Sequence, residues 1–357
     1  MSLFFRMLSL VFTLVVVGCS SVGPVQLREE RQDFNMALQK TNDEQMLLNL
    51  IRMKYRDTTM FLEVNALASQ YTLTGSVSAS GSFANNFGNS VGLGTALEYQ
   101  QRPTISYTPL GGEKFITRLL KQLDPETISL LFKSGWSVER LLLVCFERVK
   151  NMPNAPSASG PTPSYVPRFK KFHELAEFLR QQQIRGALEL NLAKEGKDGS
   201  VGFRLSLNEL ADKAAKASLT EYLGENETQQ YFISPRSDKG ITFETRSLRE
   251  VLFFLSQGIE VPESHIEDGK VTITKDEDGK VFDWREVTGK LMKIKSCACL
   301  TAPTNAYVSV RYRGHWFFIE DDDLNSKSTF GLLMQLYNLQ AGDIKERPLV
   351  LTLPVGG

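Results

Sequence analysis

Cysteine, histidine and net charge are scarce in this sequence. Its 357 residues include four cysteines and three histidines, and 41 basic residues balance 41 acidic ones, so the formal net charge is zero. A nucleic-acid-binding domain usually carries a basic stripe, and we therefore expect no nucleic-acid partner. The histidines, His173, His265 and His315, lie far apart and show no ligand spacing with the cysteines. We predict neither a metal site nor a cofactor.

Catalytic motifs are also lacking. The sequence has no Walker A loop, no H-E-x-x-H and no Cys/His pair at a family spacing. Residues 88–92 match G-x-S-x-G, but a nucleophile elbow requires a buried strand before the serine and a helix after it. A turn rich in Ser, Asn and Gly precedes this serine, and Gly92 and Gly94 disfavour a helix after it. We expect a protein that is not an enzyme.

One acidic turn resembles the start of a calcium-binding loop. Asp321, Asp323 and Asn325 follow D-x-D-x-N, but Ser326 replaces the turn glycine and Leu332 stands where the loop needs a bidentate glutamate. We therefore interpret this stretch as a solvated turn before a helix, whose N-terminus favours acidic residues.

What the sequence does contain, at its start, is an apolar leader. Arg6 supplies a positive charge, residues 8–17 are apolar except for Ser9 and Thr13, and the small residue Gly18 follows. A secretory signal combines a charged start, an apolar core and a small-residue cleavage site. Two alternatives remain. One is a transmembrane helix, which needs about 20 apolar residues. The other is an ordinary secretory signal with another cleavage site.

The residues around Cys19, Val-Val-Val-Gly-Cys-Ser-Ser, resemble the type II signal peptide of bacterial lipoproteins, although Val16 stands where that family most often has Leu. The resemblance implies that residues 1–18 are removed and that Cys19 carries acyl chains, several of which anchor a protein stably to a membrane. Ser20 in place of Asp favours the outer membrane, with the protein facing the periplasm or the cell surface. Residues 19–27 form a short tether.

The mature chain predicts an α+β fold in two domains. Residues 28–150 combine a long amphipathic helix, a Gly/Ser-rich hairpin and a group of short helices, and residues 168–357 alternate hairpins with separate helices. Residues 151–167 contain five prolines and several small residues, which is typical of an extended linker.

The most unusual stretch of the mature chain is a predicted hairpin at residues 72–101. Apolar or small residues take the odd positions and hydroxyl-bearing or other small residues most of the even ones, in two runs joined by a turn at residues 85–89. A period of two in two runs about an Asn/Gly turn predicts a β-hairpin. Its candidate membrane or assembly residues are Leu73, Val77, Phe83, Val91, Leu93, Leu97 and Tyr99.

Two interpretations of this hairpin remain open from the sequence. It is either a soluble Gly/Ser-rich flap or an element that enters a membrane or an assembly. Both runs have the 9–11 residues of a tilted membrane strand. A lone hairpin cannot cross a bilayer, because its edges leave backbone groups unpaired, so several copies would have to close a ring of strands. The curli secretion channel offers an analogy of design for such an arrangement.

The remaining cysteines predict at most one structural disulfide. Cys145 lies in an apolar helical run, whereas Cys297 and Cys299 are separated by one residue. A bond between Cys297 and Cys299 would close a very small ring, so a bond from one of them to Cys145 is the more plausible pairing. His315 and Trp316 are interpreted as a half-buried pair or as a stacking surface for a sugar or a partner.

Several segments together resemble an uncharacterised family of proteobacterial lipoproteins. They are the leader, residues 47–64, the hairpin, residues 102–115, the Trp-Ser start of a helix at Trp136, and residues 314–336. The resemblance implies no activity. We expect a lipid-anchored envelope protein with a scaffolding or assembly role, as a homo-oligomer or in an envelope complex. The alternatives are a periplasmic domain on a lipid tether that binds a ligand or a polysaccharide, or an enzyme.

Overall fold

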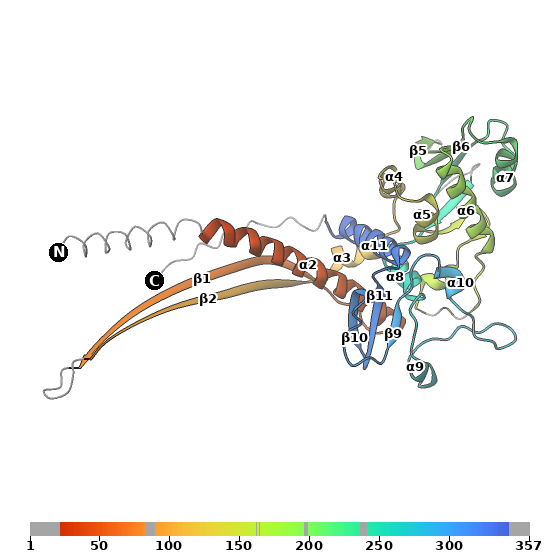
Figure 1. Cartoon of the computed structure of the whole chain (residues 1–357). Helices are drawn as coiled ribbons and strands as arrows, with labels where there is room; N and C mark the ends of the chain where they lie inside the picture. Colours follow the sequence, from red (N-terminus) through yellow and green to blue (C-terminus); the bar gives the residue numbers. More distant parts are fainter. Residues whose placement is uncertain are drawn as a thin grey trace. The chain divides into compact units, whose positions relative to one another are not determined.

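The computed structural model describes residues 22–82, 90–161, 163, 165–195, 199–235 and 241–342. Helices make up 44% and sheets 25% of it, which confirms the α+β class. Residues 60–112 form one compact unit, which we call the hairpin unit, and the rest forms a second unit, which we call the body (Figure 1). Among the described residues, no helix has the length and apolar character needed to span a membrane.

The hairpin unit consists of two long strands, β1 (Phe61–Ser82) and β2 (Ser90–Leu110). Figure 1 shows them as two neighbouring ribbons that run antiparallel. The sequence predicts one separate strand before residue 72 and another after residue 101. In the structure, the first belongs to β1 and the second to β2. Residues 66–82 contain no proline or charged residue, so β1 continues through them without a break.

The body begins with α2 (Val22–Lys54), a single helix of 33 residues. Its C-terminal part is core: Met46, Leu50 and Met53 recur on one face and are buried. Between residues 31 and 42 no side chain is buried, and Phe34 and Leu38, which continue the same stripe, are only half-buried. The helix is therefore packed into the body from Asp43 onward, whereas residues 31–42 are exposed or half-buried.

Three short helices follow the hairpin in sequence: α3 (Glu113–Leu120), α4 (Pro125–Lys133) and α5 (Val138–Cys145). Ser137 caps α5 as its sequence predicts, because its side chain accepts a hydrogen bond from the N–H of Arg140. These helices contact α6 (Lys170–Ile184), α8 (Leu248–Ser256) and α11 (Leu324–Gly342), all of which come from the C-terminal half of the chain.

A six-stranded sheet lies in the body in the order β4-β3-β8-β7-β6-β5. Its pairs are antiparallel except for β7 with β8. The strands are β3 (Phe146–Val149), β4 (Met152–Pro153), β5 (Leu188–Glu195), β6 (Ser200–Leu207), β7 (Gln230–Ser234) and β8 (Ile241–Thr245). Helices α4 and α6 contact this sheet, and α7 (Lys213–Leu223) follows β6 in the chain.

A second sheet of three strands has the order β10-β11-β9. It contains β9 (Lys295–Cys297), β10 (Ala306–Tyr312) and β11 (His315–Glu320), and the short helices α9 (Glu263–Glu267) and α10 (Arg285–Thr288) precede it. The last two strands join at Arg313 and Gly314, which both have positive φ. The long helix α2 contacts β10. The C-terminal strand that the sequence predicts at residues 347–355 lies outside the described residues.

Residues 151–167 do not separate two domains in the structure. Met152 and Pro153 form β4 of the six-stranded sheet, and Pro156–Ser159 form the 3-10 helix η1. The amide of Asn154 is buried and donates to the carbonyls of Leu143 and Phe146. The proline-rich stretch thus packs inside one compact unit, because its polar groups find partners that composition alone does not reveal.

The centre of the body is organised around one fully buried cation, Arg246. Its guanidinium donates to the backbone carbonyls of Leu143, Val144, Phe146 and Asn154 and to the hydroxyl of Ser159. It also lies over the ring of Phe254, 4.0 Å from the ring centroid. Burial is the largest influence on Arg246 and lowers its pKa to about 10, against the opposing charge of Glu147. Arg246 therefore joins α5, β3, Asn154, η1 and α8 through hydrogen bonds and ring contact.

The cysteines do not pair as the sequence suggests. Cys297 and Cys299 form a disulfide with their Cα atoms 5.3 Å apart, and Cys145 is a free, buried thiol. The prediction of a bond to Cys145 is wrong, because that residue is enclosed in the core at the end of α5. Burial raises the pKa of the Cys145 thiol to about 12.

The acidic stretch at residues 320–323 leads into α11. The sequence predicts Ser326 or Ser328 as the N-cap of this helix, but the helix begins at Leu324. The carboxylate of Asp323 accepts hydrogen bonds from the N–H and the hydroxyl of Ser326. Asp321 accepts from Lys327 at 2.6 Å. Asp323 therefore occupies the capping role that the sequence assigns to Ser326 or Ser328.

Replacing Arg246 tests its place at the centre of the body. Arg246→Ala removes a donor from four buried backbone carbonyls, two of which keep only the Asn154 amide, and we expect the free energy of unfolding to fall by about 3–5 kcal/mol. Arg249→Ala is the matched control: this arginine lies three residues further along the chain, on α8, is exposed, and should cost less than about 1 kcal/mol. Urea unfolding of both variants measures the difference, and equal losses would contradict the assignment.

Candidate functional site

The first candidate site is the ladder between β1 and β2. Four pairs at its base run from Phe61↔Leu110 to Val64↔Tyr107, and a register shift follows at Asn65. Seventeen consecutive pairs then run from Ala66↔Ser106 to Ser82↔Ser90. At about 3.3 Å per residue this second stretch is roughly 55 Å long. Its 17 residue pairs far exceed the mean strand length of about six residues.

The register of this ladder places the predicted apolar positions of both strands on one face. Directly opposite residues in an antiparallel pair share a face, and odd-numbered residues of β1 stand opposite odd-numbered residues of β2 throughout the second stretch. The pairs with candidate residues are Leu73↔Tyr99, Gly75↔Leu97, Val77↔Thr95, Ala79↔Leu93 and Gly81↔Val91. Two runs that alternate separately in the sequence thus become one two-stranded surface.

The opposite face collects the hydroxyl-bearing and small residues. Its pairs include Thr74↔Glu98, Ser76↔Ala96, Ser78↔Gly94 and Ser80↔Gly92. The register thus gives the ladder one face of apolar or small residues and one face of mostly polar or small residues. Two other candidate residues, Phe83 and the lipidation site Cys19, lie outside the described residues.

The outer edges of this ladder lack the protection that edge strands usually carry. The described residues form a sheet of β1 and β2 alone, without a third strand. Natural edges are commonly blocked by charged residues, proline or bulges. Residues 66–82 contain no charged residue and no proline, and residues 90–101 contain only Glu98. Pro103, Pro109 and the register shift at Asn65 all lie toward the base.

The second candidate site is an open groove between α2 and β10. Its volume is about 440 Å³, within the range of ligand-binding clefts. One face of α2 lines it with residues at helical spacing, and the strand and its preceding loop line the other side. The lining residues are Met36, Gln39, Lys40, Asp43, Glu44, Ala302, Pro303, Ala306, Tyr307, Val308 and Ser309.

Ionisable groups meet inside this groove. The hydroxyl of Tyr307 donates to the carboxylate of Asp43 at 3.2 Å. Burial raises the pKa of Asp43 in spite of that hydrogen bond, and burial together with Asp43 raises the pKa of Tyr307 to about 12. Lys327 lies 5.0 Å from the centroid of the Tyr307 ring. Shifted ionisable groups in a hollow of this size mark a binding-site candidate.

A third group of polar residues gathers where α2 ends. The Tyr55 hydroxyl lies 2.7 Å from Nδ1 of His265, and the rings of His265 and His315 are 4.8 Å apart. Arg313 pairs with Asp57 at 2.9 Å and covers the Tyr55 ring. Burial raises the pKa of Tyr55 to about 12 and lowers that of His265. Each of these groups is engaged by its neighbours, so the cluster fastens α2 to the β10–β11 turn and to α9.

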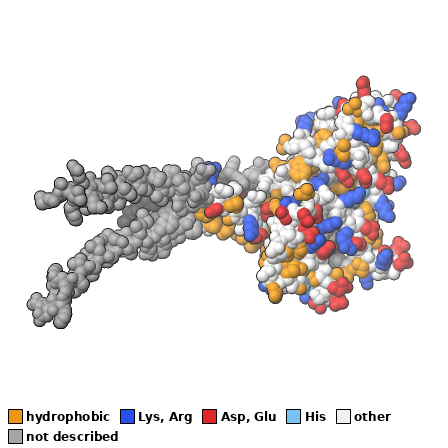
Figure 2. Space-filling view, in the orientation of Figure 1, with side chains coloured by type: hydrophobic (Ala, Val, Ile, Leu, Met, Phe, Trp, Pro, Cys, Tyr) orange, Lys and Arg blue, Asp and Glu red, His pale blue; other side chains and the backbone are white. Residues whose placement is uncertain are grey.

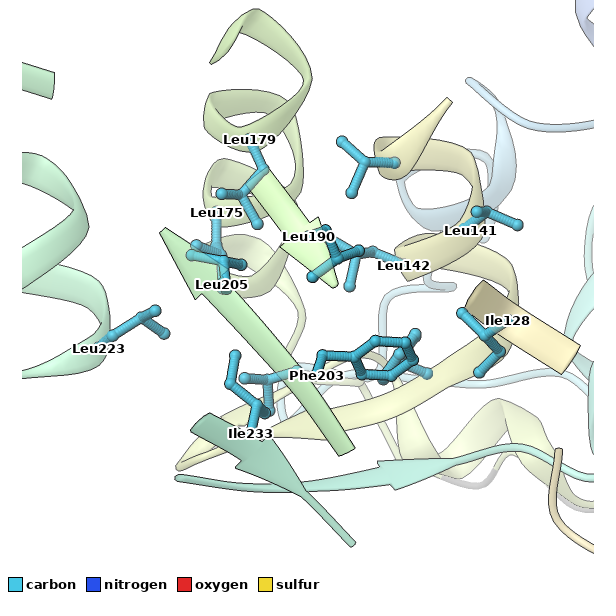
Figure 3. Close-up of a pocket in the computed structure, with 13 residues that line it drawn as sticks. Ile128, Leu141, Leu142, Leu175, Leu179, Leu190, Phe203, Leu205, Leu223 and Ile233 are labelled. Atoms are coloured by element: carbon cyan, nitrogen blue, oxygen red, sulfur yellow. The ribbon is translucent and has the colours of Figure 1, made fainter. Parts of the chain in front are cut away.

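The interior of the body contains a small apolar cavity (Figure 3). It measures about 40 Å³ and lies among α4, α5, α6, α7 and the six-stranded sheet. Figure 3 shows leucine and isoleucine side chains and the ring of Phe203 around it. No lining residue has a polar side chain to hold a water molecule. The cavity is also far smaller than a ligand pocket, so we interpret it as a packing gap.

The remaining candidates are dispersed. His315 lies in the cluster at the end of α2, whereas the neighbouring Trp316 is half-buried with its indole nitrogen enclosed and without a hydrogen-bond partner. Among the described residues no group of His, Cys, Asp and Glu has a geometry suited to a metal ion. On the face of the body seen in Figure 2, positive and negative side chains are interspersed.

Comparisons of the chain with models of known protein families, with curated proteins and with solved structures found no match. The function must therefore be argued from the candidate sites themselves.

One histidine of the body carries a marked electrostatic shift. His173 on α6 packs against Phe169, with ring centroids 4.9 Å apart, and its Nε2 is buried without a hydrogen-bond partner. Burial, reinforced by the charges of Lys290 and Arg246, lowers the pKa of His173 to about 4 from its ordinary value of 6.5. The folded state therefore binds a proton at His173 less readily than the unfolded state.

This shift predicts a pH-dependent stability. Above pH 6.5 the contribution of the neutral His173 to the free energy of unfolding is fully present, and it is lost as the pH falls from 6.5 toward 4, by up to about 3 kcal/mol. His173→Leu should remove this part of the dependence of the free energy of unfolding on pH, because leucine takes up no proton. Urea unfolding of both proteins between pH 7.5 and 4 measures it. Equal slopes for the two proteins would contradict the assignment.

Proposed function

We propose that this chain is a lipid-anchored envelope protein that acts as a scaffold in an assembly at the outer membrane, with the hairpin as its assembly element. The observation that carries the proposal is the register of β1 and β2. It collects Leu73, Leu93 and Leu97 on one face and the serines and threonines on the other. A two-faced ribbon of this length is suited to binding other strands or an apolar phase rather than to chemistry on a substrate.

The energetics of an isolated ribbon support this role. A hairpin without further strands is at best marginally stable in water, and each strand of the β1–β2 pair satisfies only about half of its backbone groups inside the ladder. Added strands would supply the missing hydrogen bonds, which is how extended segments bind to sheet edges in general. The hairpin therefore gains most of its stability from a partner.

The start of the chain supports the anchoring part of the proposal. Cys19 precedes the first residue of α2, Val22, by only three positions. Residues 22–42 of this helix, at about 1.5 Å per residue, would act as a rigid spacer of roughly 30 Å between the acyl chains and the packed part of α2. Attachment to the membrane also raises the effective concentration of the hairpin at its site of assembly.

The groove between α2 and β10 supports a second candidate function, the binding of a small polar ligand such as a glycan fragment. Its volume and the Asp43–Tyr307 pair are the specific observations in its favour. The hairpin remains the preferred element, since the groove is open and wide whereas the ladder has two chemically distinct faces.

Lipid anchoring is tested by changing the modified residue. Cys19→Ala should move the protein from the membrane fraction to the soluble fraction of the envelope and abolish incorporation of labelled palmitate. Ser20→Asp is the matched control, because it should keep the lipid while retaining the protein at the inner membrane. An unchanged fractionation of Cys19→Ala would contradict the anchor.

The assembly role is tested by shortening the hairpin. Replacing residues 67–105 by a four-residue turn keeps the basal pairs from Phe61↔Leu110 to Val64↔Tyr107. We expect the unaltered protein to form a high-molecular-weight complex in mild detergent and the shortened variant to form none. The thermal unfolding of the body should not change, because residues 60–112 are a separate unit. A complex of undiminished size would refute the assembly role.

The groove is tested with soluble glycan fragments. If it binds them, Asp43→Asn combined with Tyr307→Phe should weaken binding at least tenfold, a loss of about 1.4 kcal/mol. Glu126→Gln on α4, away from the groove, is the control. Calorimetric titration of the three proteins gives the affinities, and the absence of any binding by the unaltered protein would remove this candidate.

A further inference from the structure

The outer edges of β1 and β2 resemble each other in sequence character. From Ala66 to Ser82 the outer edge of β1 belongs to an uncharged, proline-free strand, and from Ser90 to Gln101 the outer edge of β2 carries the single charge of Glu98. The two strands run antiparallel and alternate in the same phase. A strand that pairs with one of these edges should therefore be antiparallel, nearly uncharged and alternating, and the hairpin itself contains two such strands.

We propose that the partner of the hairpin is a second copy of this chain, with β1 of one copy paired to β2 of the next until the copies close a ring of strands. This inference rests on the proposed function only in taking the hairpin as the assembly element. It adds the identity of the partner and the order of the strands.

Pairing β1 of one copy with β2 of the next is favoured over pairing β1 with β1. Pairing β1 with β1 of a second copy would leave both β2 edges open. Pairing β1 with β2 of the next copy is a head-to-tail contact, which repeats and leaves no edge once a ring closes. The up-down order of β1 and β2 continues around such a ring, since each new contact is antiparallel as well.

Charged residues and prolines limit the part of each strand that can form the contact between copies. Copies meet without like-charge repulsion along residues 66–82, which have no charged side chain. Pro103 and Pro109 lack the N–H that a ladder requires, so the part of β2 that is free of proline ends at Arg102. The contact between copies is therefore expected along the upper part of the ribbon, where residues 73–81 stand opposite residues 91–99.

The same upper part has the dimensions and the two faces that a bilayer requires. Nine residues of each strand, 73–81 and 91–99, match the 9–11 residues of a tilted membrane strand. In a closed ring every backbone group has a partner, which is the condition for β-structure to enter hydrocarbon. The face that holds Leu73, Leu93 and Leu97 would then meet lipid, and the face that holds Ser76, Ser78 and Ser80 would line the interior.

Co-expression of two full-length chains with different affinity tags tests this inference. Purification through the first tag in mild detergent should recover the second chain in a fixed ratio, and the hairpin-shortened variant should recover none. Recovery of a different protein at stoichiometric amounts, without the second chain, would overturn the inference but leave the assembly role standing. Recovery of neither would overturn both.

Two proline variants locate the contact on the strand edges. Backbone groups of consecutive strand residues point to opposite edges, so one of Ala79→Pro and Ser80→Pro breaks the β1–β2 ladder and the other blocks the outer edge. Both should reduce recovery of the second chain at least tenfold. Leu300→Pro, at a residue 96% exposed in a loop of the body, is the control and should leave recovery unchanged.

Full recovery with both proline variants would overturn the edge pairing. Thermal unfolding of the body verifies that each variant chain is folded, because the body and the hairpin are separate units.

Discussion

A backbone N–H or C=O group that leaves water needs a hydrogen-bond partner, and this constraint governs both units of the structure. In the body the buried cation Arg246 helps to meet it, since it donates to the carbonyls of Leu143, Phe146 and Asn154, where α5, β3 and the residue after β4 come together. In the hairpin, β1 and β2 form backbone hydrogen bonds with each other, and the described residues add no third strand to their sheet. The outer edges of the two strands are therefore the part of the structure where this constraint is least met.

This difference connects the features at the start of the chain. The proposed lipid on Cys19, the first part of α2, where residues 31–42 are exposed or half-buried, and the two-faced ribbon follow one another in the sequence, and each suits a protein that assembles at a membrane. In the cluster where α2 ends, Tyr55, His265 and Asp57 are occupied in contacts within the body. The groove beside Asp43 is the place in the body where a ligand would most readily bind.

Patterns of local origin were predictable from the sequence. The period of two in residues 72–101 predicted a hairpin, and Ser137, which caps α5, predicted a helix start. Features that depend on distant partners were not. Residues 151–167 have the composition of a linker, yet Asn154 and Ser159 bind groups brought in by α5 and Arg246. Three other features were also not predictable from the sequence. They are the pairing of Cys297 with Cys299, the continuation of the strands to residues 61 and 110, and the groove between α2 and β10.

The most direct test of the account is the mass of the full-length, lipid-modified protein in detergent, measured by native mass spectrometry. The account predicts one discrete species whose mass is an integer multiple, greater than two, of the single chain. A strictly monomeric protein, with its hairpin intact and its body folded, would contradict it.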